Sequence, residues 1–201
     1  MIVLKLGGSL FRHGPDILKC VERTGMDVLV VPGGGEFADL VRKVDVEYSL
    51  SDDASHWMAV LAMDQYAYYL SDMTGIPLTS DFSDREGIRI ALPYEMLRKK
   101  DDLPHSWDVT SDTIAAWIAH MTGSLLIKAT DVDGIIKDGT LIERIDAPAL
   151  AGSGESCIDA ALPHYLMKYG MNALVVNGLY GSRIEDAVLG KKTVGTLILG
   201  K

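Results

Sequence analysis

A lysine and two glycines stand at the end of the first apolar run of the chain. In "MIVLKLGGSL", Lys5 interrupts a stretch that otherwise reads as a buried strand, and Gly7, Gly8 and Ser9 follow it. A lysine inside such a strand loses hydration, and glycines at its exit weaken the local structure. Both features are explained if an anion lies over the turn, because glycine backbone N–H groups can approach phosphate oxygens closely.

Two later strand exits share this glycine chemistry. "VVPGGGEF" places Gly33, Gly34 and Gly35 after an apolar run, and "NALVVNGLYG" places Asn177 and Gly178 after another. Strand ends of a parallel sheet meet at one edge, where open α/β folds bind their ligands. None of these turns fits the P-loop or the dinucleotide-binding pattern. Each turn alone is weak evidence for a ligand site, and Gly33 to Gly35 could be a turn that binds no ligand.

Short apolar runs alternate with helical patterns along the chain. This alternation predicts an α/β fold with a mainly parallel central sheet and helices on both faces. The expected strands are 2–6, 27–31, 124–130, 172–176 and 195–199, and the expected helices are 16–24, 36–44, 52–74 and 111–122. Apolar residues recur at near-helical spacing in 52–74, and its aromatics Trp57, Tyr68 and Tyr69 are expected in the core.

Two further segments carry local signals. Thr110 or Ser111 should cap the helix at 111–122, which puts Asp112 in the first turn, where the helix dipole favours a carboxylate. Near a buried ammonium this carboxylate would keep the lysine charged and aimed. "GIIKDGTLIERI" reads as a hairpin that turns at Asp138-Gly139. The polar stretch 79–106 is expected to be an irregular excursion from the sheet.

The composition narrows the classes of partner. The 201 residues carry a formal net charge of −9, which argues against broad binding to nucleic acid or to anionic membranes. A small anionic ligand remains compatible, since its site needs only local positive charge. There is no secretory leader pattern and no apolar run of transmembrane length. Cys20 and Cys157 lack metal-ligand spacing, so we expect reduced thiols and a cytoplasmic protein.

Five segments together resemble the amino acid kinase family, in kind and in order. They are "KLGGSL", "VVPGGGEFADLV", "DVTSDTIAAWIA", "LLIKATDVDGII" and "NGLYGSRIEDAVLGKKTVGTLI". The resemblance implies an open αβα sandwich formed by one domain, 1–201, that moves the γ-phosphoryl group of ATP to a small acceptor with the help of Mg²⁺. It further implies that the N-terminal half, about 1–110, binds the acceptor and that about 111–201 binds the nucleotide. A homo-oligomer, a dimer or larger, is implied as well.

The resemblance also suggests residue roles. Lys5 would be the catalytic cation beside the transferring phosphoryl group, and Asp112 would orient it. The residues expected at the phosphates and nucleotide are Gly7, Gly8, Ser9, Lys128, Thr130, Asp131, Asp133, Gly134, Asn177, Gly178, Tyr180 and Lys191. Those expected at the acceptor are Gly33, Gly34, Gly35, His56, Trp107, Asp108 and Thr110. No dedicated metal site is expected, since the ATP phosphates would supply most magnesium ligands.

Several of these residues have a simpler reading. Asp131 and Asp133 could be solvated loop carboxylates, and Tyr180 could serve packing as well as adenine. His56 could be an ordinary surface or core histidine. The pair Trp107 and Asp108 would suit an acceptor with an amine on a flat ring, although such a pair also arises by chance.

One feature departs from the family pattern. Several members carry a second catalytic lysine in the region that here reads "GESCIDAALPHYL", and no lysine occurs between Lys137 and Lys168. Either Lys128 or Lys191 supplies the second cation, or the metal neutralises more of the charge.

The identity of the acceptor is the part of the function that the sequence specifies least. Within the family, the chain most resembles the branch of methanofuran biosynthesis, on the basis of its small size, "HSWDVTSDT" and the missing lysine. That branch phosphorylates an (aminomethyl)furanylmethyl phosphate to its diphosphate. Isopentenyl phosphate and uridylate kinases are alternatives in the same family. A non-catalytic nucleotide-binding or storage protein on this fold is the alternative of another class.

Overall fold

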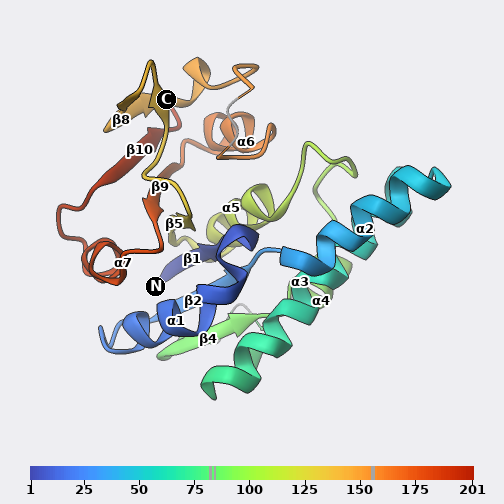
Figure 1. The fold of residues 1–201 in the computed structure, drawn as a ribbon, viewed down its shortest axis with the longest axis horizontal. Coiled ribbons are helices and arrows are strands. Elements are labelled where there is room, and N and C mark those ends of the chain that lie inside the picture. The colour runs from blue at the N-terminus through green and yellow to red at the C-terminus, as the bar shows by residue number, and fades with distance from the viewer. Residues whose placement is uncertain (82, 84, 155–156) are drawn as a thin grey trace.

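A mainly parallel sheet lies at the centre of the molecule. The computed structural model describes residues 1–81, 83, 85–154 and 157–201. In this part of the chain an eight-stranded sheet has the order β3-β4-β2-β1-β5-β9-β10-β8, with helices on both faces (Figure 1). The strands are β1 (Ile2–Leu6), β2 (Val28–Pro32), β3 (Leu78–Thr79), β4 (Ile88–Ala91), β5 (Leu125–Thr130), β8 (Arg144–Asp146), β9 (Asn172–Asn177) and β10 (Gly195–Leu199). The predicted α/β class is confirmed.

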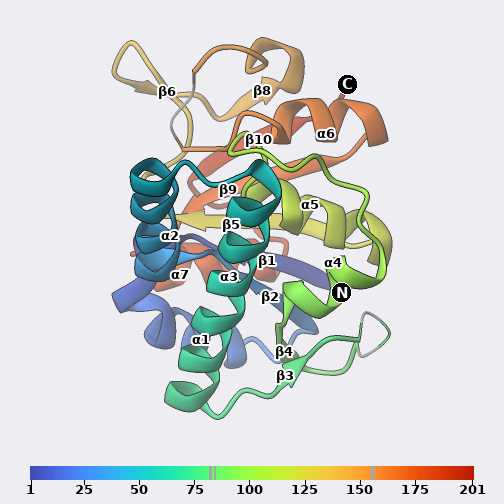
Figure 2. The ribbon, with the colours of Figure 1, turned by 90° about the vertical axis from the view of Figure 1, so that its right-hand side faces the viewer.

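The helices connect these strands. They are α1 (Gly14–Glu22), α2 (Gly35–Tyr48), α3 (Asp52–Thr74), α4 (Pro93–Lys99), α5 (Ser111–Thr122), α6 (Leu162–Tyr169) and α7 (Gly181–Val188), with short 3₁₀ turns η1 (Gly8–His13) and η2 (Ala147–Ala149). Figure 2 shows α2 and α3 side by side. No helix within the described residues is long and apolar enough to cross a membrane. Neither Cys20 nor Cys157 forms a disulfide.

Strand β1 occupies the middle of the sheet. It pairs in parallel with β2 on one side and β5 on the other, and β9 with β10 is the antiparallel pair of the described sheet. Successive strand residues point to opposite faces. Val3 therefore packs with the cluster under α4, α5 and α6, whereas Leu4 and Leu6 pack with α1 and α7. By the same alternation Lys5 shares the face of Val3, toward α5.

The segment 79–106 is more regular than its polarity suggests. It contains β4 and α4, and β4 pairs with β2 so that Ile88 lies opposite Val28. The expectation of an irregular excursion is wrong here. A strand this short, with Arg89 in its middle, lacks a signal of its own and is stabilised by the neighbouring strand.

The hairpin is confirmed in part. Strands β6 (Ile136–Lys137) and β7 (Thr140–Leu141) pair antiparallel across Asp138 and Gly139, whose φ angles are 51° and 75°. Positive φ at both central residues is what a tight two-residue hairpin requires. The hairpin is shorter than predicted, because Ile145 belongs to β8 and pairs with Ile198 in the main sheet.

The long helix has its predicted bounds, and its predicted core residues are buried only in part. Ser51 accepts a hydrogen bond from the backbone N–H of Ala54 at 3.3 Å and caps the start of α3. Its buried side includes Tyr66, which is 0% exposed, whereas Leu61 and Tyr68 are 40% and 60% exposed. The expectation of core aromatics is wrong for Tyr68, whereas Trp57 and Tyr69 are half-buried against the core.

Candidate active site

Two lysines and one carboxylate meet at the centre of the sheet. Lys5 on β1 and Lys128 on β5 are directly paired positions in the parallel register, so their side chains leave the same face next to each other. Asp112, in the first turn of α5, lies between them. Its Oδ1 is 2.7 Å from Lys5 Nζ, and its Oδ2 accepts a hydrogen bond from Lys128 Nζ. All three side chains are buried.

Burial and charge set the protonation of this trio. Burial lowers the pKa of Lys5 to about 8, although the charge of Asp112 opposes the shift. Burial alone would raise the pKa of Asp112, yet the charges of Lys128 and Lys5 hold that pKa far below its usual range. With both lysines protonated, the trio carries one net positive charge. Such a fixed positive charge is suited to a phosphate group.

Asp159 supports this trio and was not singled out from the sequence. Its backbone N–H donates to Asp112 Oδ2 at 3.0 Å. Its carboxylate accepts hydrogen bonds from the backbone N–H groups of Thr110 and Thr113, at 2.9 Å each, and from Leu162 at 2.8 Å. One carboxylate thus ties together the starts of α5 and α6. The only local signal was an Asp three residues before a helix start, because its α5 partners lie more than forty positions away.

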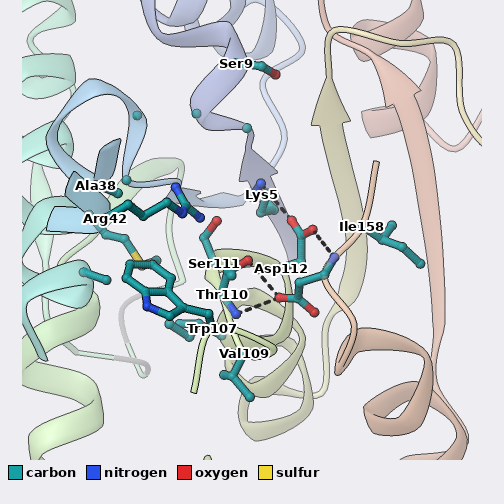
Figure 3. Close-up of a pocket in the computed structure, with 18 of the residues that line it drawn as sticks. Lys5, Ser9, Ala38, Arg42, Trp107, Val109, Thr110, Ser111, Asp112 and Ile158 are labelled. Carbon is teal, nitrogen blue, oxygen red and sulfur yellow. Dashed lines mark hydrogen bonds and ion pairs between the residues drawn. The ribbon is translucent and has the colours of Figure 1, made fainter. Parts of the chain in front are cut away.

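A cavity of about 640 Å³ opens beside the trio, at the carboxyl ends of β1 and β5. Its size is ordinary for a small-molecule site. Figure 3 shows its wall around Lys5, Asp112 and Trp107. The cavity brings together many of the residues singled out from the sequence, namely Lys5, Gly7, Gly8, Ser9, Gly34, Gly35, His56, Trp107, Thr110, Asp112, Lys128, Thr130 and Asp131.

The first two glycine turns face each other across the cavity wall. A Cβ atom on Gly8 would lie 2.8 Å from the backbone N of Gly35, and one on Gly33 would lie 2.8 Å from the backbone N of Gly8. Side chains would force these turns apart. The backbone N–H groups of Gly7 and Gly33 donate to Ala129 and Leu6 carbonyls, so these two hold the turns in place rather than facing a ligand.

Other expected ligand residues lie outside the cavity lining. They are Gly33, Asp108, Asp133, Gly134, Asn177, Gly178, Tyr180 and Lys191. Contrary to expectation, the Asp108 side chain is exposed, and its backbone carbonyl accepts a hydrogen bond from Ala161 N–H at 3.0 Å. Adjacency to Trp107 in the sequence does not make the two side chains point the same way.

The loops after β5 and β9 are held together by polar contacts. Asn177 Nδ2 and Arg183 donate to Asp133 Oδ1 at 2.8 and 2.6 Å. Gly178 and Gly134 are close-packed positions, since added Cβ atoms would lie 2.5 Å from Leu10 Cδ1 and 2.4 Å from Thr196 Oγ1. These residues shape the loops. Tyr180 is 52% exposed and lies under the Arg183 guanidinium, and Lys191 is exposed.

Arg42 is a cavity residue that sequence reasoning missed. It lines the cavity from α2, and its guanidinium carbon lies 4.7 Å from the centroid of the Trp107 ring (Figure 3). Trp107 is in turn fixed by a 2.6 Å hydrogen bond from its Nε1 to Asp45. Cation–aromatic contact of this kind holds an arginine in one place. In the sequence Arg42 looks like an ordinary surface-helix arginine three residues after Asp39.

The model of the amino acid kinase family matches residues 1–177. The chain belongs to the amino acid kinase family. This confirms the resemblance seen in the five sequence segments.

Relatives within the family share the whole length of the chain. The [5-(aminomethyl)furan-3-yl]methyl phosphate kinase of Methanocaldococcus jannaschii is 33% identical over 214 residues, covering 100% of this chain and 98% of that protein. The uridylate kinase of Mycobacterium sp. (strain KMS) is 29% identical over 242 residues, covering 98% and 90%.

Solved structures of family members share the fold. The uridylate kinase of Archaeoglobus fulgidus superposes with a TM-score of 0.75 at 21% identity, over 98% of this chain and 100% of that one. The UMP kinase of Bacillus anthracis gives a TM-score of 0.76 at 18% identity, over 100% and 96%.

The residues of the cavity fit a magnesium nucleotide. The buried trio offers fixed positive charge, and Asp131 lines the cavity as a carboxylate. Asp133 is already engaged by Asn177 and Arg183, so the described loop after β5 offers few protein ligands for Mg²⁺. Mg²⁺ commonly takes most of its ligands from phosphates and water.

Proposed function

We propose that this protein is an ATP-dependent kinase that transfers the γ-phosphoryl group to the phosphate of a small acceptor. The observation that carries the proposal is the buried Lys5–Asp112–Lys128 trio beside a cavity lined by facing glycine turns. Phosphoryl transfer needs positioning and charge stabilisation more than covalent chemistry by the protein. A fixed pair of ammonium groups supplies that stabilisation.

The two lysines act together in this proposal. Lys5 and Lys128 stand side by side, so both ammonium groups face the oxygens between which the phosphoryl group moves. The carboxylate of Asp112 holds both ammonium groups in place, and Asp159 fixes Asp112 through its backbone N–H. Mg²⁺, when bound with ATP, supplies further neutralisation of phosphate charge. Lys128 then takes the role of the second cation, and Lys191 does not.

We further propose that the acceptor is [5-(aminomethyl)furan-3-yl]methyl phosphate, converted to its diphosphate in methanofuran biosynthesis. The Methanocaldococcus jannaschii relative, which is named as the kinase of this compound, matches the full chain at 33% identity. The end of the cavity that is lined by α2 and α3 offers groups that match the phosphate, the ring and the ammonium of this compound. Arg42 is the group for the acceptor phosphate, Trp107 offers an aromatic face, and Asp52 offers a carboxylate for the ammonium.

Uridylate kinase activity is the second candidate, because uridylate kinases also match 98% of the chain. An aminomethyl group distinguishes the two acceptors, since UMP carries no ammonium for Asp52. In both cases residues of about 1–110 would bind the acceptor and those of about 111–201 the nucleotide.

An ADP-release assay with ATP and Mg²⁺ tests the kinase proposal. The acceptors are the furan phosphate, UMP and isopentenyl phosphate, with a reaction lacking acceptor as the blank. We expect acceptor-dependent ADP release that the substitution Lys5→Met lowers by about 10²- to 10⁴-fold in kcat, with ATP affinity within several-fold. ATP binding without turnover of any acceptor would instead favour a nucleotide-binding or storage protein.

We also propose a cytoplasmic homo-oligomer. Leu40 on α2 is 62% exposed and Tyr68 on α3 is 60% exposed, and apolar side chains on a protein surface favour association. Light scattering should give a mass of at least two chains, and a monomer mass would contradict the oligomer.

A further inference from the structure

A second cluster of ligand-type side chains lies at the edge of the cavity, apart from the lysine trio. Within the described residues, His56, Asp101 and His105 bring nitrogen and oxygen ligand atoms within 4.8 Å of one another. His56 comes from the first turns of α3, and the other two come from the segment between α4 and α5. Asp53, in the first turn of α3, contacts His105 as well.

His56 is the unusual member of this cluster. Its side chain is 5% exposed, and its Nε2 has no hydrogen-bond partner among the described residues. A buried ring nitrogen without a partner costs free energy. A metal ion bound beside His56 would give this nitrogen a partner.

The ring of His105 is held between two carboxylates. Its Nδ1 lies 2.5 Å from Asp53 Oδ1, and its Nε2 lies 3.1 Å from Asp101 Oδ2. A ligating histidine commonly uses its second nitrogen to bond a carboxylate, which fixes the ring. Two ligands of a tetrahedral ion with bonds of about 2.0–2.1 Å are roughly 3.3 Å apart, close to the separation of His105 Nε2 and Asp101.

We propose that His56, Asp101 and His105 bind a divalent transition-metal ion such as Zn²⁺, with Asp53 orienting His105. Imidazole and carboxylate ligands suit Zn²⁺ or Co²⁺, whereas Mg²⁺ prefers oxygen alone. The site is thus chemically distinct from magnesium bound with nucleotide. It qualifies the expectation that the chain has no metal site of its own.

Binding requires one local rearrangement. The His56 and His105 rings are nearly parallel, at 13°, with centroids 4.0 Å apart. To direct both nitrogens at one ion, the His56 ring must turn about its last side-chain bond, whose torsion is broad and soft. The ligand atoms, now within 4.8 Å of one another, must also draw in toward the separation of roughly 3.3 Å in a tetrahedral site. An ion there would add positive charge at the cavity wall, because His56 lines the cavity.

Calorimetric titration of Zn²⁺ into the chelator-treated full chain, without nucleotide, tests the proposal. We expect one ion per chain and a loss of at least about tenfold in affinity for His56→Gln and for His105→Gln. Asp53→Asn should weaken binding by about ten- to a hundredfold through the orientation of His105. The matched controls His164→Gln, Asp102→Asn and Cys20→Ser should bind as the unchanged chain does.

No Zn²⁺ binding by the unchanged chain, or an affinity in His56→Gln and His105→Gln equal to that of the unchanged chain, would overturn the proposal. Because His56 is buried, its variant could fail to fold, so Asp101→Asn with Co²⁺ gives a second test. The unchanged chain should show the intense visible absorption of tetrahedral Co²⁺, and this partly exposed variant should lose it. Retention of that spectrum in Asp101→Asn would contradict the ligand set.

Discussion

Lys5 and Lys128 occupy directly paired positions on two adjacent parallel strands, and the carboxylate of Asp112 lies between their ammonium groups. Like charges on neighbouring strands repel each other, so this pairing would be unfavourable by itself. Asp112 compensates both charges from the start of α5. The arrangement provides two cations without the later lysine that several family members carry.

The second-cation role of Lys128 is tested against Lys191. We expect Lys128→Met to lower kcat by about 10²-fold or more, because a buried charge near the transferring group is lost. Lys191→Met should change kcat by less than about threefold, since this exposed side chain lies outside the cavity. Steady-state kinetics at saturating ATP measures both. The reverse order of effects would assign the second cation to Lys191.

Asp112 should matter for stability as well as for catalysis. Asp112→Asn leaves two buried ammonium groups without their counter-charge, which should lower the free energy of unfolding by about 3 to 5 kcal/mol. Adding Lys5→Met removes one of those groups, so the double variant should be more stable than the sum of the single changes predicts. Urea denaturation of the four proteins gives the coupling. Strictly additive losses would disprove the pairing.

The ionisation of Lys5 should appear in the pH dependence of activity. Its ammonium is present below its pKa, which burial lowers to about 8 in the ligand-free protein. The value of kcat/KM for ATP should therefore fall as pH rises through about 8, because this parameter reports groups of the free enzyme. Lys5→Met should lack that limb in its residual activity. A profile for the unchanged chain that stays flat to pH 10 would contradict the assignment.

The lowered pKa of Lys5 affects stability in the opposite direction: activity should fall as pH rises, whereas stability should increase. An unfolded chain keeps Lys5 protonated up to its ordinary pKa of 10.5, whereas the folded chain releases the proton near 8. Between these values the unfolded state binds more protons, so the contribution of Lys5 to stability rises with pH. Loss of activity there is therefore not explained by unfolding at this residue.

Kinetics can tell whether Asp52 or Asp108 binds the ammonium group of the acceptor. Asp52→Asn should raise KM for the furan phosphate by about tenfold or more and leave KM for UMP nearly unchanged, because only the first acceptor carries an amine. Asp108→Asn should leave both KM values unchanged, since its side chain lies outside the cavity. Equal losses on both acceptors with Asp52→Asn would show that Asp52 does not recognise the amine.

The parts of the fold that follow from local pattern were predictable from the sequence. The buried strand around Lys5, the glycine turns and the start of α5 each have a signal within a few residues. Strand β4 was missed, because its stability comes from pairing with β2 rather than from its own composition.

Side-chain partners across long sequence distances could not be predicted in this way. Asp159 reaches Thr113 from 46 positions away, and Arg42 meets Trp107 only after α2 and the segment before α5 come together. Asp108 shows the converse error, since a neighbour in sequence was taken for a neighbour in the site. Such relationships depend on tertiary packing, which no local pattern encodes.

Identification of the reaction product tests the central claim most directly. The chain is incubated with Mg²⁺, ATP and [5-(aminomethyl)furan-3-yl]methyl phosphate, and the product is examined by ³¹P NMR. We predict two mutually coupled phosphorus signals of a furanylmethyl diphosphate, formed together with ADP and strongly reduced with Lys5→Met. A diphosphate formed from UMP or isopentenyl phosphate but not from the furan would contradict the acceptor, and no phosphoryl transfer to any of the three would contradict the kinase itself.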